Sequence, residues 1–191
     1  MRNLLTRIRA CTECATDLPH GPRPIVAASP ECRIVIIGQA PGRKVHETGV
    51  PWNDPSGDRL RDWMDVDQET FYDDRLVAIV PMGFCYPGKG RSGDLPPRPE
   101  CAPLWHAPVL RAMPKIRLTL LIGRFAQGHY LEGRQRASLT ETVRSFDEYV
   151  GDGLLPLPHP SPRNNLWIRR NPWFRRLVVP ALRRNVAVAL T

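Results

Sequence analysis

The sequence has no apolar run that approaches the roughly 20 residues needed to span a bilayer. Its opening segment, MRNLLTRIRACTEC, contains basic residues but no apolar stretch of signal-peptide length. Together these absences predict a cytoplasmic protein that has no membrane partner.

Acidic residues are missing from the C-terminal part of the chain. Residues 153–191 contain no Asp or Glu but seven arginines, and the whole chain carries a net charge of +8. The arginines are Arg163, Arg169, Arg170, Arg175, Arg176, Arg183 and Arg184. One interpretation is a solvated basic face. Arginine rather than lysine favours the other, a phosphate-binding surface, because a guanidinium makes two parallel hydrogen bonds to phosphate.

Cysteine is scarce and its count is odd, which argues against a disulfide framework in a cytoplasmic chain. The five cysteines are Cys11, Cys14, Cys32, Cys85 and Cys101. A zinc ribbon prefers two Cys-x-x-Cys pairs, and only Cys11 and Cys14 form one. One close pair with two spaced single cysteines suits a 4Fe–4S cluster; zinc and free thiols are the alternatives. Cys32 precedes the first predicted strand, so we expect it to pack in the core.

The length of 191 residues suits a single domain, 1–191, with one sizeable core. Four short apolar runs are continuous rather than alternating, as expected of parallel strands in a sheet covered on both faces. The runs are Arg33–Ile37, Leu76–Val80, Leu118–Ile122 and Leu154–Leu157.

Helical patterns separate these runs. The alternation predicts a three-layer α/β/α sandwich around a central four-stranded, mostly parallel sheet. The predicted helices are one capped by Ser56 that includes Leu60 and Trp63, then Leu104–Met113, Phe125–Leu131, one opened by the Ser138/Glu141 capping box, and one opened by Asn171-Pro172 and kinked at Pro180.

Parallel sheets place ligands beyond the carboxyl ends of their strands. Three distinctive segments lie at such ends: Gly38–Gly42, Pro81–Cys85 and His159–Ser161. The segment Gly83–Pro103 is predicted to be a long loop, and a long ordered loop usually needs an anchor.

Four features, in order, carry a family resemblance. GQAPG at Gly38–Gly42 and HPSPRN at His159–Asn164 resemble motifs A and B of uracil-DNA glycosylases. TGVPWNDPSGD at Thr48–Asp58 resembles the stretch that follows motif A in the thermophile-type branches, and the cysteine layout also resembles theirs. The resemblance covers about residues 11–164.

This resemblance implies a monofunctional DNA glycosylase. Such an enzyme flips a deaminated base, most often uracil, out of DNA, hydrolyses its N-glycosidic bond and leaves an abasic site for base excision repair. It also implies a monomer, DNA with a damaged base as partner, and no nucleotide cofactor. A structural 4Fe–4S cluster would be held by four cysteines, namely Cys11, Cys14, Cys85 and Cys101.

The resemblance assigns the turn of Gly38, Gln39, Ala40, Pro41 and Gly42 to the flipped base and to water positioning, with Gln39 in the catalytic set. An ordinary strand-to-helix turn is the alternative. Some relatives carry an aspartate general base within this turn, where this chain has Ala40, which takes no proton.

The general base is therefore expected elsewhere, and Asp54 is the candidate. It matches an Asp-x-Ser-Gly-Asp segment of one branch, and a carboxylate near the sugar activates water and stabilises an oxocarbenium-like state. Alternatively, Asp54 or Ser56 only caps the following helix. His46 and Glu47 are other candidates for the base.

Three further positions are assigned by the resemblance. Trp52 stacks on the extruded base, with a core tryptophan as the alternative. His159 hydrogen-bonds the base carbonyl and stabilises the departing anion. Pro81 stands where many relatives have an asparagine that reads the uracil edge, so weaker and broader base selection is expected.

The loop of Ser161, Pro162, Arg163 and Asn164 is expected to bind DNA through the minor groove. Ser161 and backbone amides would hold phosphates, and Pro162 or Arg163 would fill the space that the base leaves. Two rival hypotheses stay open: a DNA-binding relative with a degenerate site, and a relative in which a nucleophile such as His46 traps an abasic sugar.

Overall fold

The central sheet of this computed structural model, which describes residues 1–191, has four parallel strands. These are β1 (Ile34–Ile37), β2 (Val77–Ile79), β5 (Leu118–Ile122) and β6 (Leu154–Leu157), in the order β2-β1-β5-β6. The predicted fold class is confirmed. The predicted strand boundaries agree at β5 and β6 and are one residue too long at the start of β1 and at both ends of β2.

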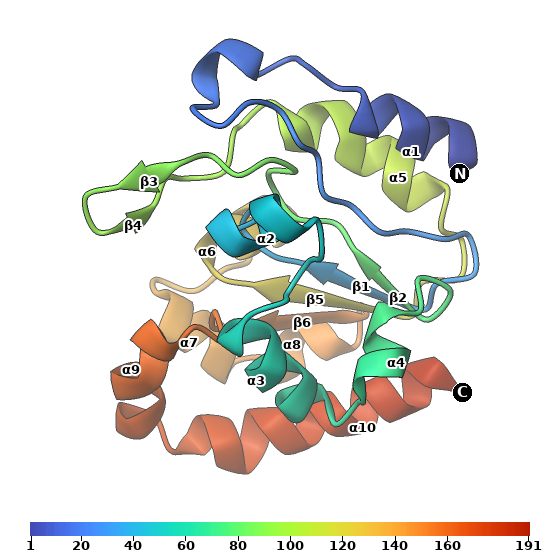
Figure 1. The fold of residues 1–191 in the computed structure, drawn as a ribbon. Coiled ribbons are helices and arrows are strands. Elements are labelled where there is room, and N and C mark those ends of the chain that lie inside the picture. Colours follow the sequence, from blue (N-terminus) through green and yellow to red (C-terminus); the bar gives the residue numbers. More distant parts are fainter.

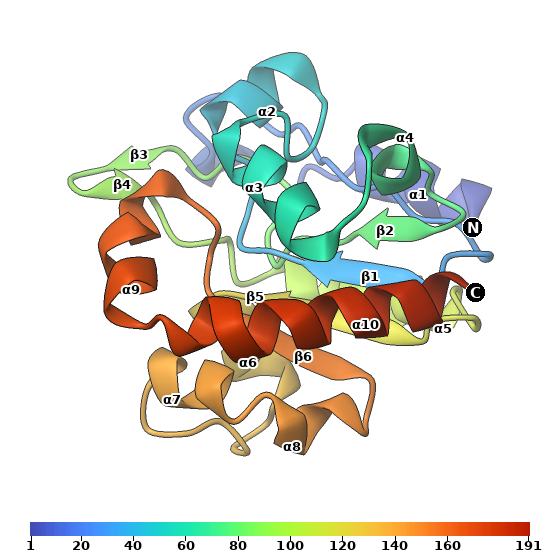
Figure 2. The same ribbon diagram turned by 90° about the horizontal axis from the view of Figure 1, so that it is seen from below.

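Helices cover both faces of the sheet, which explains why the strand sequences are apolar throughout (Figure 1). On one face, Ile34 and Ile36 pack with Leu60 of α3 (Pro55–Met64) and Leu182 of α10 (Val179–Leu190). On the other, Val35 packs with residues of α1 (Arg2–Arg9) and α5 (Ala107–Arg111). Figure 2 shows α10 running along the sheet beneath β1 and β5. No helix is both long and apolar enough to cross a membrane.

The helix predicted to be capped by Ser56 begins two residues earlier than that cap allows. The N-cap of α3 is Asp54, whose Oδ1 accepts a hydrogen bond from the Gly57 N–H at 2.9 Å, and Pro55 occupies the first helical turn. Ser56 is buried within that turn, so its prediction as the cap is wrong. The cap at Ser138 is confirmed: its Oγ accepts from the Glu141 N–H at 3.2 Å, at the start of α7 (Leu139–Arg144).

Two predicted helices contain a π-helical turn directly before a proline. The turn Ala102–His106 leads into α5, which contains Pro108, and the turn Phe174–Val178 leads into α10, which contains Pro180. Proline lacks an N–H and its ring crowds the carbonyl four residues earlier, so a wider turn relieves both problems. At Pro180, where a kink is predicted, the helix changes from a π-helical to an α-helical turn.

Short elements escaped the sequence patterns. They are α2 (Arg43–Thr48), α4 (Gln68–Tyr72), α8 (Asp147–Val150), α9 (Asn165–Arg170), and a hairpin of β3 (Lys89–Gly90) and β4 (Gly93–Asp94). The helix predicted at Phe125–Leu131 is confirmed as α6 (Arg124–Tyr130), shifted by one residue. The hairpin lies inside the predicted long loop Gly83–Pro103 and projects beyond the carboxyl end of the sheet (Figure 1).

Gly57 is enclosed by the chain that precedes α3. A Cβ there would lie 1.7 Å from the carbonyl oxygen of Trp52, and Trp52 itself has a positive φ of 57°. The close approach requires glycine, since no side-chain movement removes a backbone atom.

We therefore expect Gly57→Ala to lower the free energy of unfolding by about 2–4 kcal/mol, through overpacking against backbone. Gly128→Ala in α6 is the matched control, because nothing lies within 4 Å of a Cβ at Gly128. It should raise stability by about 0.5–1 kcal/mol through helix propensity. Urea denaturation measures both; equal effects of the two variants would contradict this packing.

Candidate functional site

A cleft of about 520 Å³ opens at the carboxyl ends of the strands. All three segments predicted to meet at this edge line it. The predicted residues that it brings together are Gly38, Gln39, Ala40, Pro41, Gly42, Trp52, Asp54, Pro81, His159, Ser161, Pro162, Arg163 and Asn164. The geometry establishes one shared site, and the individual roles of these residues remain predictions.

His159 follows β6 and is held in one tautomer by the segment after it. Its Nδ1 accepts a hydrogen bond from the Ser161 N–H at 3.1 Å, so the ring proton belongs on Nε2. The Asn164 side chain donates to the His159 carbonyl at 2.7 Å and fixes the backbone. Burial lowers the pKa of His159, and the charges of Asp54 and Asp94 oppose this only in part. His159 is therefore a neutral hydrogen-bond donor near pH 7.

Trp52 lines the cleft beside His159, with ring centroids 5.7 Å apart and planes inclined by 31°. A Cβ on Gly38 would lie 3.0 Å from the Trp52 ring, so this glycine lets the indole lie against the motif turn. The same ring also packs against the core. Trp52 thus contacts both the core and the cleft, and its stacking on a base stays a prediction.

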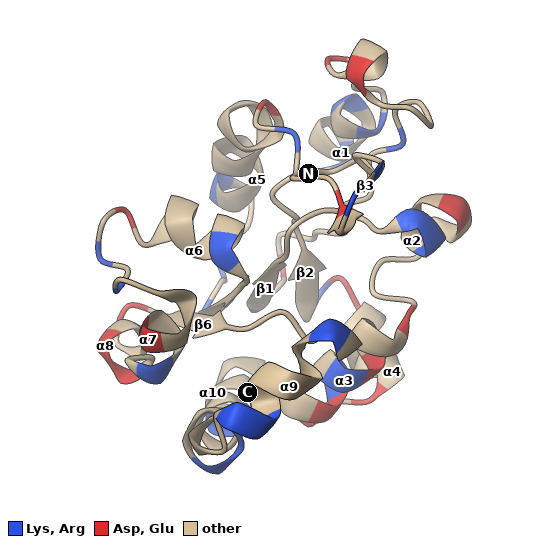
Figure 3. Cartoon of the chain, turned by 90° about the vertical axis from the view of Figure 1, so that its left-hand side faces the viewer, with Lys and Arg blue, Asp and Glu red and all other residues tan.

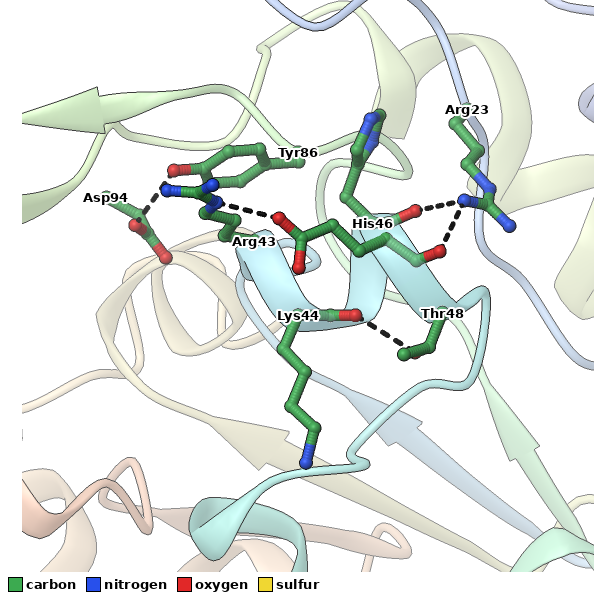
Figure 4. A network of polar contacts seen from close by, with 8 residues as sticks. Arg23, Arg43, Lys44, His46, Thr48, Tyr86 and Asp94 are labelled. Atoms are coloured by element: carbon green, nitrogen blue, oxygen red, sulfur yellow. Dashed lines mark hydrogen bonds and ion pairs between the residues drawn. The ribbon is translucent and has the colours of Figure 1, made fainter.

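Asp54 caps a helix and also lines the cleft, and its role as the general base stays a prediction. Its Oδ1 caps α3, whereas Oδ2 makes no hydrogen bond within the chain, and the residue lines the cleft. The other candidate bases lie outside. His46 packs beside Tyr86 with ring centroids 5.9 Å apart, and Glu47 forms an ion pair with Arg43 at 2.8 Å (Figure 4).

The end of β2 is fixed by backbone hydrogen bonds. The N–H groups of Met82 and Gly83 donate to the carbonyls of Gly38 and Gln39, each at 2.9 Å. The Pro81 carbonyl lies 3.0 Å from Nε2 of His106, a buried histidine whose pKa burial lowers to about 4. At neutral pH this imidazole therefore donates to the Pro81 carbonyl.

Sequence reasoning missed the wall of the cleft formed by the β3–β4 hairpin. Ser92, Gly93, Asp94 and Leu95 line the cleft, and so does the buried Ser56. Two-residue strands give no periodic signal, so nothing in the sequence marked this segment as part of the site. The hairpin is joined to the motif-B segment by Arg163, whose Nη1 donates to the Ser92 carbonyl at 3.2 Å.

Basic residues surround the cleft, but the seven C-terminal arginines do not form one surface. Figure 3 views the molecule from the side toward which the strands point and shows Lys or Arg on α2, α3, β3, α6 and α9. Arg59 of α3 donates to the Ser161 carbonyl at 3.3 Å. Arg183 instead donates to the Asp62 carbonyl at 2.9 Å, near the far end of α3. The basic rim thus combines residues from across the sequence.

The four cysteines predicted as ligands line one small cavity. Cys11, Cys14, Cys85 and Cys101 meet there with Arg98, which is paired with Asp17 and Glu100 at 3.1 and 2.6 Å. Burial raises the pKa of Cys14 and of Cys85 to about 11. No three His, Cys, Asp or Glu side chains are close enough to hold a single metal ion.

Cys32 lies apart from that cavity, as predicted. It is fully buried and its Sγ is 3.3 Å from Sδ of Met113.

The position of the ring proton on His159 and the direction of its pKa shift can be tested by nuclear magnetic resonance. The ¹⁵N spectrum should show Nε2 protonated at pH 7, with a titration midpoint below about 6.5, the usual value for histidine. Because the unfolded chain gains this proton first, the contribution of His159 to stability should fall as the pH falls below about 6.5. His159→Gln assigns the signals. A midpoint at or above 6.5, or a proton on Nδ1, would contradict the assignment.

A comparison with protein families identifies the superfamily to which the chain is similar. The family described as the uracil DNA glycosylase superfamily matches residues 26–183. The matched region includes all three strand-end segments and the hairpin, whereas Cys11 and Cys14 precede it.

Proposed function

This chain belongs to the uracil DNA glycosylase superfamily, and from this premise we propose that it is a monofunctional DNA glycosylase. It extrudes a deaminated base, uracil first among them, hydrolyses the N-glycosidic bond with an activated water and leaves an abasic site in base excision repair. The observation that carries the proposal is one cleft that holds a neutral histidine donor, an aspartate with a free oxygen and a tryptophan face.

The proposed chemistry divides between the two sides of the scissile bond. His159 Nε2–H donates to a carbonyl of the departing base and stabilises its negative charge. Asp54 Oδ2 accepts a proton from the attacking water and stabilises positive charge on the sugar, while Gln39 helps to position that water. Trp52 stacks on the base. The mechanism needs no lysine nucleophile, because water attacks directly.

Binding of DNA is assigned to the rim of the cleft. Ser161 and backbone amides of the motif-B segment hold phosphates, and Pro162 or Arg163 fills the space left by the base. Arg59 and Arg163 lie at this rim with part of each guanidinium already engaged by the chain. These contacts orient the two side chains before DNA arrives.

The geometry argues against one of the two rival hypotheses and leaves the other open. Covalent trapping by His46 requires that residue in the cleft, which it does not line. A DNA-binding relative without chemistry remains a second candidate, because Ala40 and Pro81 replace polar side chains on the cleft wall. Oligonucleotides that contain uracil, hypoxanthine or xanthine distinguish the two. Alkali-labile abasic sites appear only if the chain is an enzyme.

We also propose that the four-cysteine cavity holds a structural 4Fe–4S cluster, which would place the chain with the thermophile-type branches. Zinc–sulfur bonds of about 2.3 Å need thiolates that nearly touch, whereas a cluster of four irons and four sulfides spaces its thiolates more widely. Four cysteines that line one cavity supply the ligand set that such a cluster needs. The cluster would pin the Gly83–Cys101 segment.

Asp54→Asn separates catalysis from capping, because asparagine caps helices as well as aspartate does. We expect unchanged stability and DNA binding but a fall of about 10²–10⁴-fold in the single-turnover rate. His159→Ala should cost a comparable factor. Asp58→Asn, on an exposed position of the same helix, is the control and should keep full activity. Normal cleavage by Asp54→Asn would remove Asp54 from the mechanism.

The cluster is tested without any activity measurement. Protein purified without oxygen should be brown and contain about four irons and four sulfides per chain, the content of one such cluster. Cys85→Ala should bleach the protein and increase proteolysis between Gly83 and Cys101. Cys32→Ala, outside the cavity, should leave the colour unchanged. Colourless, iron-free protein would refute the assignment.

A further inference from the structure

Asp94 places a second carboxylate in the cleft, opposite the motif-A turn. It ends β4 and lines the cleft together with Gly42. A Cβ on Gly42 would lie 3.6 Å from Asp94 Oδ2, so the carboxylate reaches across to the turn that begins α2.

The Asp94 carboxylate is oriented from behind by a buried tyrosine. The Tyr86 hydroxyl donates to Oδ1 at 3.5 Å, and Tyr86 is only 2% exposed (Figure 4). Its ring is stacked on His20 with centroids 5.4 Å apart and is flanked by His46. The tyrosine therefore occupies one carboxylate oxygen, and the other remains available beside Gly42.

The proposed mechanism assigns Asp54 Oδ2 and Gln39 to the attacking water, and several backbone carbonyls of the cleft wall already accept one hydrogen bond within the chain. Pro81 has no polar side chain, and its carbonyl already accepts from His106. The carbonyls of Gly38 and Gln39 accept from Met82 and Gly83. His159 Nε2 supplies a donor. Uracil, hypoxanthine and xanthine each present a ring N–H beside a carbonyl, so they need an acceptor as well as a donor.

We propose that Asp94 is a specificity-determining residue that accepts a hydrogen bond from a ring N–H of the extruded base. The β3–β4 hairpin thereby takes on the role that the strand-end side chain at Pro81 cannot perform. A carboxylate accepts and does not donate, so it disfavours base edges that offer only acceptors at this point. This inference rests on the proposed function, since it concerns the base bound in the same cleft.

The test measures binding without cleavage. The probe is an oligonucleotide with one 2′-fluoro-2′-deoxyuridine, whose fluorine suppresses positive charge on the sugar, and the reference is a stable abasic analogue. The preference for the uracil probe over the reference isolates contacts to the base. Asp94→Ala should lower this preference by about 5- to 100-fold, the usual worth of a base-edge contact. Asp94→Asn keeps an acceptor oxygen and should stay within a few-fold of the unmodified protein.

Two further variants complete the design. Tyr86→Phe removes the orienting hydroxyl and should give an intermediate loss. Glu47→Gln removes one carboxylate charge from neighbouring α2, outside the cleft, and should change nothing. Asp94 is exposed, so each Asp94 variant is expected to fold, which thermal melting verifies.

An unchanged preference in Asp94→Ala would overturn the inference. An equal loss in Asn and Ala would also overturn it, because charge rather than acceptance would then be responsible. Failure of the proposed function has a different signature: unmodified uracil DNA would yield no abasic sites, whatever the binding preference.

Discussion

Two backbone hydrogen bonds hold the site together: those from Met82 and Gly83 to the carbonyls of Gly38 and Gln39. They continue the pairing of β1 and β2 beyond the last strand residues, so the motif-A turn and the end of β2 move as one unit. At the end of β6, the buried Gln127 donates to the carbonyls of Leu121 and Leu157 and links β5 to β6 two residues before His159. The carboxyl ends of the strands therefore form a firm base for the cleft. The β1–β2 side and the β5–β6 side are aligned by the sheet itself, so no flexible loop has to be ordered to align them.

Trp52 illustrates how close packing sets the shape of the cleft. Its left-handed backbone conformation is unfavourable for a large side chain and costs of order 1–3 kcal/mol. Two glycines make the conformation possible: Gly38 admits the ring and Gly57 admits the carbonyl. Strain of this kind persists where the surroundings leave no alternative, and here it directs the indole into the cleft beside His159.

The sequence predicts the fold best where burial determines which residue types can occur. The four strands follow from continuous apolar runs. The three predicted strand-end segments meet at one cleft because the parallel strands end on the same side, whereas His46 and Glu47, the alternative candidates for the base, do not line it. The sequence leaves both Asp54 and Ser56 as candidate caps, because both residue types cap helices well, and only the direction of the Gly57 N–H distinguishes them. Asp94 carried no signal at all, since a two-residue strand has no period. The seven C-terminal arginines do not lie on one face of the molecule. The helices α9 and α10, which carry most of them, lie at an angle to each other that the composition does not predict (Figure 2).

The hairpin wall stands outside both hydrophobic clusters that stabilise the domain. Its tip is joined to the opposite side of the cleft by Arg163, through one hydrogen bond to the Ser92 carbonyl. Lengthening, shortening or replacing the hairpin would therefore leave the sheet and its helices intact. Mutation can remodel the cleft on this side at little cost to folding, so new ligand preferences are accessible to the scaffold without a redesign of its core.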